Sequence, residues 1–509
     1  MVRGKQKNIK LTLFCIVSSI LTLAFFHKPF LTYAARATEG GIGGVVIVSS
    51  LVILLLAVNF FASYLVLYAG RFFGRVLMAL SYIINAGCLY FINSYDVLLD
   101  KTMMGNVFNT NTAEATGYYS FSFILYILLL GVIPAVWCLV RKIDFGSFRR
   151  FLANVGISLA VCLAVGLGNV TNWPWVDSNS TVIGSLLLPW SYIVNSFRFH
   201  AEQRRNNREE ILLPDATIRN DRKEALVLVI GESARSDHFS IYGYDRPTNP
   251  RLSGIEGLKT YPAVSAATYT TGGVKAILDH KETSELYEIL PNYLYRTGVD
   301  VTWRTSNWGQ SPLHIDKYED TASLAGKYPG ENPDYDGIML KGLGELISGS
   351  AGNKVLVVLH TSTSHGPSYE KRYPPEFEVF TPVNHCVEMS KSVRSELLNS
   401  YDNSILYTDW LLAETIDVLK GLEDWKTCMI FVSDHGESLG ENKLYMHGVP
   451  ISVAPREQYE IPFIVWTSDS GQKYKPLPQA VQYNVFHSVL HFLGIDSPVY
   501  DESLNIFAE

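Results

Sequence analysis

Five long stretches with almost no charged side chains constrain this 509-residue chain more than any other feature. A helix that crosses the hydrocarbon core of a bilayer needs about 20 mostly apolar residues. We therefore expect five transmembrane helices, at Ile9–Phe26, Val45–Tyr68, Val76–Asn93, Phe121–Val140 and Phe151–Val170. A buried helix of a soluble protein explains one such stretch, but not five within 171 residues. Because four more stretches follow the first, we interpret the first as an uncleaved anchor rather than a signal peptide.

The charged residues divide the chain at about residue 171. Residues 1–171 contain 13 Lys and Arg against five Asp and Glu, a net charge of +8. The rest contains 29 basic and 44 acidic residues, a net charge of −15. This division predicts a membrane domain over residues 1–171 that is joined to a polar domain outside the membrane. The overall net charge of −7 argues against a chain-wide nucleic-acid-binding surface.

The basic residues of the first third also predict its orientation. They gather in residues 3–10, 71–75 and 141–150, and these segments lie on one side of the membrane if five helices alternate. Short basic loops face the cytoplasm. The fifth helix then leads outward, so in a bacterium the large domain lies in the periplasm or outside the cell.

Residues 172–224 differ from both neighbouring regions. The apolar run Ile183–Val194 is too short to span a membrane, and Trp and Tyr side chains in and around it are typical of a segment that lies at the membrane surface. The charged segment Gln203–Glu210 follows. We expect an interfacial helix and a linker over residues 172–224, and a periplasmic catalytic domain over residues 225–509.

Residues 225–509 alternate short aliphatic runs with helical patterns such as Ser395–Leu419. The strand-like runs are Ala225–Ile230, Val299–Trp303, Val355–Leu359 and Cys428–Val432. This alternation predicts an α/β domain with a largely parallel sheet. In such sheets ligands bind beyond the carboxyl ends of the strands. Only two cysteines lie in this domain, so we expect no disulfide framework.

Metal-ligating residue types follow these runs. Glu232 comes just after the first run, Asp434 and His435 come directly after the last, and His365 follows the third. His447 stands twelve residues after His435. Any one of them also fits a helix cap or a packed side chain. Together, carboxylates and imidazoles at strand ends predict a zinc or manganese site.

A hydroxyl nucleophile is available in a turn of small residues. Thr268, Thr270 and Thr271 precede a possible helix at Val274–Leu278. A helix N-terminus attracts an anion, and a metal can activate a hydroxyl there. An ordinary Ser/Thr turn fits equally well, and spacing does not choose among the three threonines.

A second polar cluster lies in the loop between the third and fourth apolar stretches. Asn106, Thr110 and Glu114 are spaced i, i+4 and i+8 and would share one face of a helix. A carboxylate with two neutral polar groups can hold an ammonium head group, although the spacing alone favours a solvated loop.

Several longer motifs occur in a fixed order. They are Gly231-Glu-Ser-Ala-Arg-Ser-Asp-His238, Ser364-His-Gly-Pro-Ser-Tyr369, Ser400-Tyr-Asp-Asn-Ser404, Ser433-Asp-His-Gly-Glu-Ser438 and Ala454-Pro-Arg-Glu-Gln458. With five apolar stretches before them, they resemble the phosphoethanolamine transferases of the inner membrane of Gram-negative bacteria. These include the lipid A-modifying, Kdo-modifying and mobile colistin-resistance enzymes.

The resemblance implies an alkaline-phosphatase/sulfatase-like α/β domain behind a membrane domain of five helices. It implies one tightly bound zinc ion, held by Glu232, Thr270, Asp434 and His435, and leaves a second ion open. Thr270 matches the family nucleophile. Residues implied to bind the phosphoryl group or a second metal are His365 and His447, and those implied to hold the donor head group are Asn106, Thr110 and Glu114.

The expected activity is transfer of phosphoethanolamine from phosphatidylethanolamine to lipid A, Kdo or another lipopolysaccharide sugar through a phospho-threonine. The alternatives are a glycerol-phosphate transferase and phosphoethanolamine transfer to another glycan or a protein. A sulfatase is disfavoured because Thr270-Thr-Gly-Gly-Val lacks the Pro and Arg that formylglycine formation needs. A non-catalytic receptor or transporter is disfavoured because the apolar stretches lack notable intramembrane charges.

Overall fold

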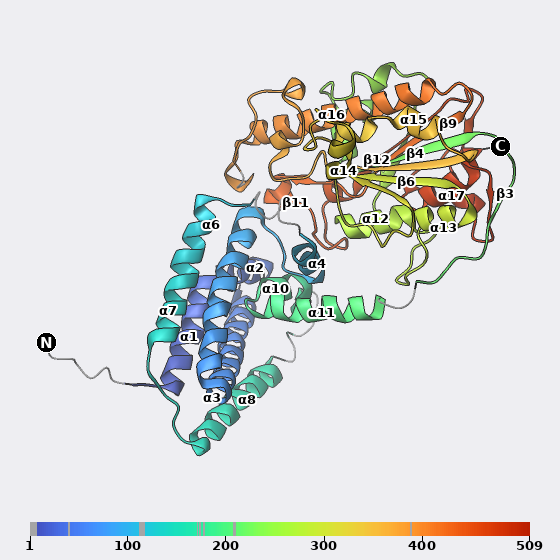
Figure 1. Cartoon of the computed structure of the whole chain (residues 1–509). Helices are drawn as coiled ribbons and strands as arrows, with labels where there is room; N and C mark the ends of the chain where they lie inside the picture. Colours follow the sequence, from blue (N-terminus) through green and yellow to red (C-terminus); the bar gives the residue numbers. More distant parts are fainter. Residues whose placement is uncertain are drawn as a thin grey trace. The chain divides into compact units, whose positions relative to one another are not determined.

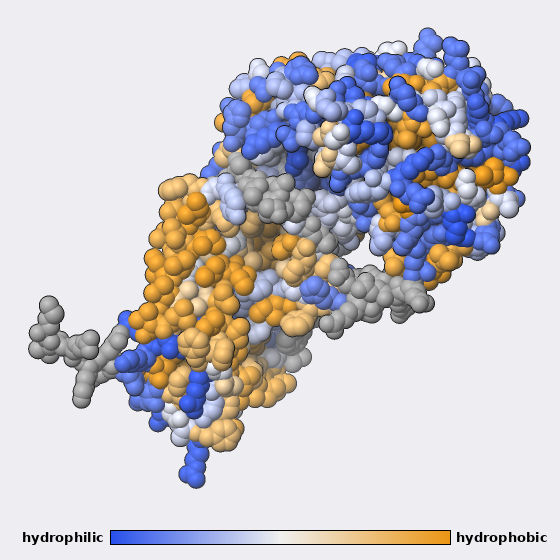
Figure 2. Space-filling view, in the orientation of Figure 1, coloured by the Kyte–Doolittle hydropathy of each residue, from blue (hydrophilic) through white to orange (hydrophobic). Residues whose placement is uncertain are grey.

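The computed structural model describes residues 8–38, 41–110, 118–169, 172, 175–176, 179–206, 210–386 and 389–508. The chain divides into two compact units, residues 1–108 with 118–199 and residues 109–117 with 200–509. Apolar side chains cover much of the visible surface of the first unit, whereas hydrophilic side chains dominate the second (Figure 2). This contrast agrees with the division of charge in the sequence.

The first unit is helical (Figure 1). Three helices in the described residues are long and apolar enough to cross a membrane, and there are four if the pair α1–α2, bent by 69°, counts as one span. Five separate spans are therefore not established by helix length and composition. The helices are α1 (Leu11–Phe26), α2 (Lys28–Ala37), α3 (Gly41–Tyr95), α4 (Lys101–Asn109), α6 (Phe121–Tyr126), the π-helical segment Ile127–Val132, α7 (Ile133–Val140), α8 (Phe148–Gly168), α10 (Ser180–Leu186) and α11 (Trp190–Asn206).

The 55-residue helix α3 reverses direction near its middle. Arg71 leaves the helical conformation, with φ 41° and ψ −99°. A Cβ atom added to Gly74 would lie 2.4 Å from the carbonyl oxygen of Val66, although residues eight positions apart in a straight helix are separated by about 12 Å. The two halves of α3 therefore pack against each other as a hairpin, and they contain the two separate stretches that the sequence predicts.

Polar side chains connect the helices of this unit. Asn154 of α8 donates hydrogen bonds to Thr12 Oγ1 of α1 (3.0 Å) and to the hydroxyl of Tyr64 in α3 (2.9 Å). Ser18 and Tyr82 join α1 to the second half of α3 at 2.7 Å. Such bonds contribute to association between helices in a bilayer, where apolar burial discriminates little between lipid and protein.

The second unit contains an eight-stranded sheet in the order β14-β5-β12-β9-β4-β8-β6-β7. The prediction of a largely parallel sheet is confirmed, since only β12 runs against its neighbours. In sheet order the strands are Ala480–Val481, Lys259–Val264, Glu460–Thr467, Lys426–Ser433, Glu224–Gly231, Lys354–His360, Asp300–Thr305 and Lys317–Asp320.

Helices cover both faces of this sheet, with α15 (Leu343–Ser348) and α16 (Arg394–Lys420) on one face (Figure 1). The opposite face carries α12 (Thr270–Leu278), α13 (Leu290–Thr297) and α17 (Asn484–Phe492). The central strands β4, β8 and β9 are buried on both faces, which explains their continuous aliphatic runs. The predicted helix at Val274–Leu278 begins earlier, at Thr270.

Smaller elements complete the unit. The end of the predicted linker joins it, because β3 (Thr217–Ile218) pairs with β15 (Ile495–Asp496). A second two-stranded pair is formed by β13 (Lys473–Tyr474) and β16 (Phe507–Ala508). Helix α14 spans Thr321–Lys327. All six cysteines fall in the described part of the chain and are free thiols there.

A buried ion pair between the first residues of β4 and β8 provides a stability test. Lys354 and Glu224 face each other across β8 and β4, are 2% and 5% exposed, and bond directly. We predict that Lys354→Met destabilises the domain by about 3–5 kcal/mol, because it leaves a buried carboxylate unpaired. Thermal unfolding of the detergent-solubilised chain should show a lower Tm. The double variant with Glu224→Leu should recover most of the loss, and a double variant as unstable as Lys354→Met would contradict this explanation.

Candidate active site

The predicted polar residues meet at the carboxyl edge of the sheet. Glu232 directly follows β4, and Asp434 and His435 directly follow β9, the adjacent parallel strand. Thr270 is the first residue of α12. All four side chains are at most 3% exposed. The strand ends therefore place two carboxylates, an imidazole and a hydroxyl in one buried space.

Three oxygen atoms surround Nε2 of His435. It lies 3.4 Å from Thr270 Oγ1, 3.5 Å from Glu232 Oε1 and 3.4 Å from Asp434 Oδ2. His435 Nδ1 is 2.8 Å from the carbonyl oxygen of Gly436, to which it donates its proton, and burial with the charge of His447 lowers the His435 pKa to about 4. The imidazole is therefore neutral, and its Nε2 lone pair faces the three oxygens.

The three distances from His435 Nε2 agree with those between ligand atoms of a tetrahedral zinc ion. Bonds of about 2.0–2.2 Å place neighbouring ligand atoms about 3.3–3.6 Å apart. Asp434 Oδ2 is buried and has no hydrogen-bond partner among the described residues. Burial and the charge of Glu232 raise the pKa of Asp434 well above its usual range. A cation would remove this penalty by balancing the two carboxylates.

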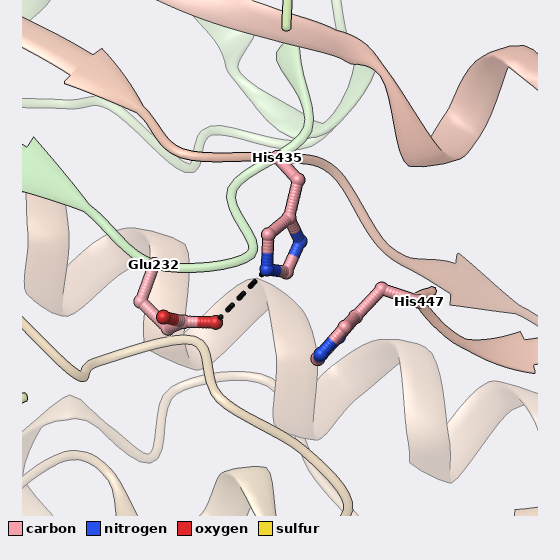
Figure 3. A group of neighbouring side chains, drawn as sticks. All are labelled: Glu232, His435 and His447. Carbon is pink, nitrogen blue, oxygen red and sulfur yellow. Dashed lines mark ion pairs between the residues drawn. The ribbon is translucent and has the colours of Figure 1, made fainter. Parts of the chain in front are cut away.

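His447 adds an imidazole to the same cluster. It follows the short hairpin of β10 (Ser438–Leu439) and β11 (Tyr445–Met446). Ligand atoms of Glu232, His435 and His447 lie within 4.8 Å of one another, and Figure 3 shows the three side chains converging. The ring of His365, in the loop after β8, lies 5.9 Å from that of His447 between centroids.

The structure separates two of the candidate threonines. Thr268 Oγ1 donates a hydrogen bond to the carbonyl oxygen of Val449 at 2.6 Å, away from the cluster, whereas Thr270 lies against His435. Gly273 explains the small residues after Thr270. A Cβ atom there would lie 2.0 Å from the carbonyl oxygen of Asp434, so only glycine allows α12 to approach this closely.

Three residues near the cluster were absent from the predicted set. Asn307 donates from Nδ2 to Glu232 Oε2 at 2.7 Å, Glu437 accepts from His447 Nδ1, and Arg372 contacts His365. Asn307 follows β6 and Glu437 stands in the motif after β9, so the strand-end rule contains a signal for both. Arg372 carries no such signal, because only the folded loop brings it to His365.

The second predicted cluster is described only in part. Asn106 lies in α4, which ends at Asn109, and Thr110 lies outside this helix. Glu114 lies outside the described residues.

Comparison with known proteins assigns the family. The family model described as phosphoethanolamine transferase EptA/EptB matches residues 54–204, and a sulfatase model matches residues 224–495. The phosphoethanolamine transferase EptA of Helicobacter pylori is 35% identical over 96% of this chain and 95% of its own length. The chain belongs to the phosphoethanolamine transferases. It is therefore a transferase enzyme, as the motifs predict.

Further similarities support this assignment. The phosphatidylethanolamine transferase Mcr-1 of Escherichia coli is 30% identical over 89% of this chain and 87% of its own length. The integral membrane phosphoethanolamine transferase EptA of Neisseria meningitidis has a TM-score of 0.88 at 24% identity, covering 98% of this chain and 97% of its own. This similarity, together with the sulfatase model, shows that the fold is a helical membrane domain joined to an alkaline-phosphatase/sulfatase-like domain.

The close approach of α12 to the site gives a sharp prediction. Gly273→Ala should lower transfer about 100-fold or more, because the added methyl displaces the backbone of Asp434, and misplacing a site by about 1 Å can cost this much. Transfer rates of the purified chain measure the effect. Gly326→Ala in α14, where an added Cβ meets no atom within 4 Å, should leave the rate unchanged. Equal rates in the two variants would contradict the packing argument.

Proposed function

We propose that this transferase moves phosphoethanolamine from phosphatidylethanolamine to lipid A, Kdo or another lipopolysaccharide sugar, with Thr270 as the covalent carrier. The observation that carries the proposal is the position of Thr270 Oγ1, 3.4 Å from His435 Nε2 in a buried cluster with two carboxylates. A hydroxyl in such surroundings is suited to nucleophilic attack on a phosphodiester whose negative charge is balanced by a bound cation.

One zinc ion is the cofactor that we propose, held by Glu232, Thr270, Asp434 and His435. When bound, it supplies a lowered pKa at the Thr270 hydroxyl and withdraws charge from phosphate oxygens. Thr270 is the first residue of α12, and the unpaired N–H groups of a helix N-terminus favour a phosphoryl anion.

In the first step, Thr270 Oγ1 attacks phosphorus, the bond from phosphorus to the glycerol oxygen breaks, and diacylglycerol leaves. In the second step, an acceptor oxygen attacks phosphorus and the bond to Oγ1 breaks. In the first step a site histidine takes the proton of the Thr270 hydroxyl and gives it to the leaving glycerol oxygen. In the second step it takes the proton of the acceptor and returns it to Thr270 Oγ1. His365 and His447 are the candidates for proton transfer and for stabilising the phosphoryl charge.

The membrane unit brings the enzyme to both lipids. We propose that the α3 hairpin supplies two spans, so that five cross the inner membrane of a Gram-negative cell. The basic segments then face the cytoplasm and the catalytic domain lies in the periplasm, with residues 172–224 at the membrane surface. Asn106, Thr110 and Glu114 are the residues that we propose for the ammonium head group of the donor.

A glycerol-phosphate transferase remains the alternative reaction, because it would use the same threonine chemistry on phosphatidylglycerol. The two reactions differ in the head group that is transferred, so a donor comparison separates them.

The test uses the full chain with donor lipids that carry an isotope label in the head group. Labelled phosphatidylethanolamine without acceptor should add the mass of phosphoethanolamine to the peptide containing Thr270, and added lipopolysaccharide should then take up the label. Thr270→Ala should abolish both signals without lowering the Tm, while Thr271→Ala should retain them. Wild-type transfer by Thr270→Ala would overturn the covalent route, and labelling from phosphatidylglycerol alone would overturn the donor.

A further inference from the structure

The two histidines beside the cluster have partners of opposite hydrogen-bonding character. His447 Nδ1 lies 2.8 Å from Glu437 Oε2, and the other oxygen of Glu437 accepts a hydrogen bond from the Tyr369 hydroxyl at 2.6 Å. While Glu437 is ionised it only accepts, so the proton of a neutral His447 then lies on Nδ1. Its Nε2 therefore carries a lone pair.

His365 has the reverse arrangement. Arg372 Nη2 lies 3.4 Å from His365 Nδ1, and Arg372 Nε donates to the His365 carbonyl oxygen at 3.2 Å. A guanidinium only donates and does not lose its proton in proteins. Nδ1 of His365 must therefore accept, and the proton of the imidazole lies on Nε2. His365 is 5% exposed, so bulk water does not compete freely for this bond.

We infer that Arg372 and Glu437 fix opposite tautomers on the two histidines and so divide their roles. His365 donates a hydrogen bond from Nε2 to a phosphoryl oxygen, and neither binds a metal nor transfers a proton through that atom. His447 supplies an electron pair from Nε2. This division rests on the proposed function and assigns the roles that the mechanism above leaves shared between His365 and His447.

The division has a physical reason. An imidazole whose Nδ1 accepts from a fixed cation cannot become an imidazolium without losing that bond, and loss of its remaining proton would leave an imidazolate. A neutral donor held in this way stabilises negative charge on the phosphoryl group as it develops, in the manner of an oxyanion hole. Arg372 is a positioning residue in this scheme, because it acts through His365.

A double-mutant cycle on the full chain tests the assignment. His365→Gln keeps an N–H donor near the position of Nε2 and has no tautomer to set. Arg372→Met should lower kcat about 10- to 100-fold in the wild-type background, on the scale of a lost transition-state hydrogen bond, but less than about threefold in the His365→Gln background. His365→Gln should retain more activity than His365→Ala. Equal losses from Arg372→Met in both backgrounds would overturn the assignment.

Two further measurements keep the test independent of folding and of the reaction. Arg372→Lys keeps a donor and should retain more activity than Arg372→Met. If both variants are folded and equally active, the assignment is wrong. Histidine ¹⁵N spectra of the full chain, assigned with His365→Gln and His447→Gln, should show a protonated Nε2 on His365 and a protonated Nδ1 on His447. The same tautomer on both residues would overturn the inference, whether or not the wild type is active. A wild-type chain that transferred no phosphoethanolamine would instead refute the proposed function.

Discussion

A single buried lone pair faced by three oxygen atoms is the arrangement on which the rest of the catalytic domain depends. Gly231 of β4 is paired with Ser433 of β9, and Glu232 and Asp434 are the next residues on the two strands. The register of β4 against β9 therefore brings both carboxylates to one edge of the sheet. Without a cation, burial and the charge of Glu232 raise the pKa of Asp434 well above its usual range, so the two buried carboxylates are not both ionised. The sheet therefore builds a buried cluster of donor atoms that is suited to a cation.

The surrounding structure fixes this cluster rather than adding to its chemistry. Aliphatic side chains on both faces hold the central strands, and α12 approaches the strand ends closely because Gly273 has no side chain. Asn307 donates to the outer oxygen of Glu232 and so orients its carboxylate. Residues that position the ligands of a metal in this way commonly tune affinity and activity.

Much of this architecture follows from local sequence, because strand-like runs, apolar stretches and strand-end residues are local signals. The positions of Glu232, Asp434 and His435 were predictable for that reason. Spacing did not single out Thr270, since Thr268 and Thr270 differ only in which tertiary partners they meet, and only the resemblance to the family pointed to it. Arg372 escaped prediction likewise, because only the folded loop after β8 brings it to His365.

The metal content of the purified full chain tests the central claim most directly. Elemental analysis should find at least one zinc ion per wild-type chain, and Asp434→Asn should lose most of that zinc while keeping its far-ultraviolet circular dichroism spectrum. The neutral amide keeps the shape of the side chain but removes the charge that the cluster needs to hold a cation. A wild-type chain that transfers phosphoethanolamine at full rate after its metal has been removed by chelation would contradict the account.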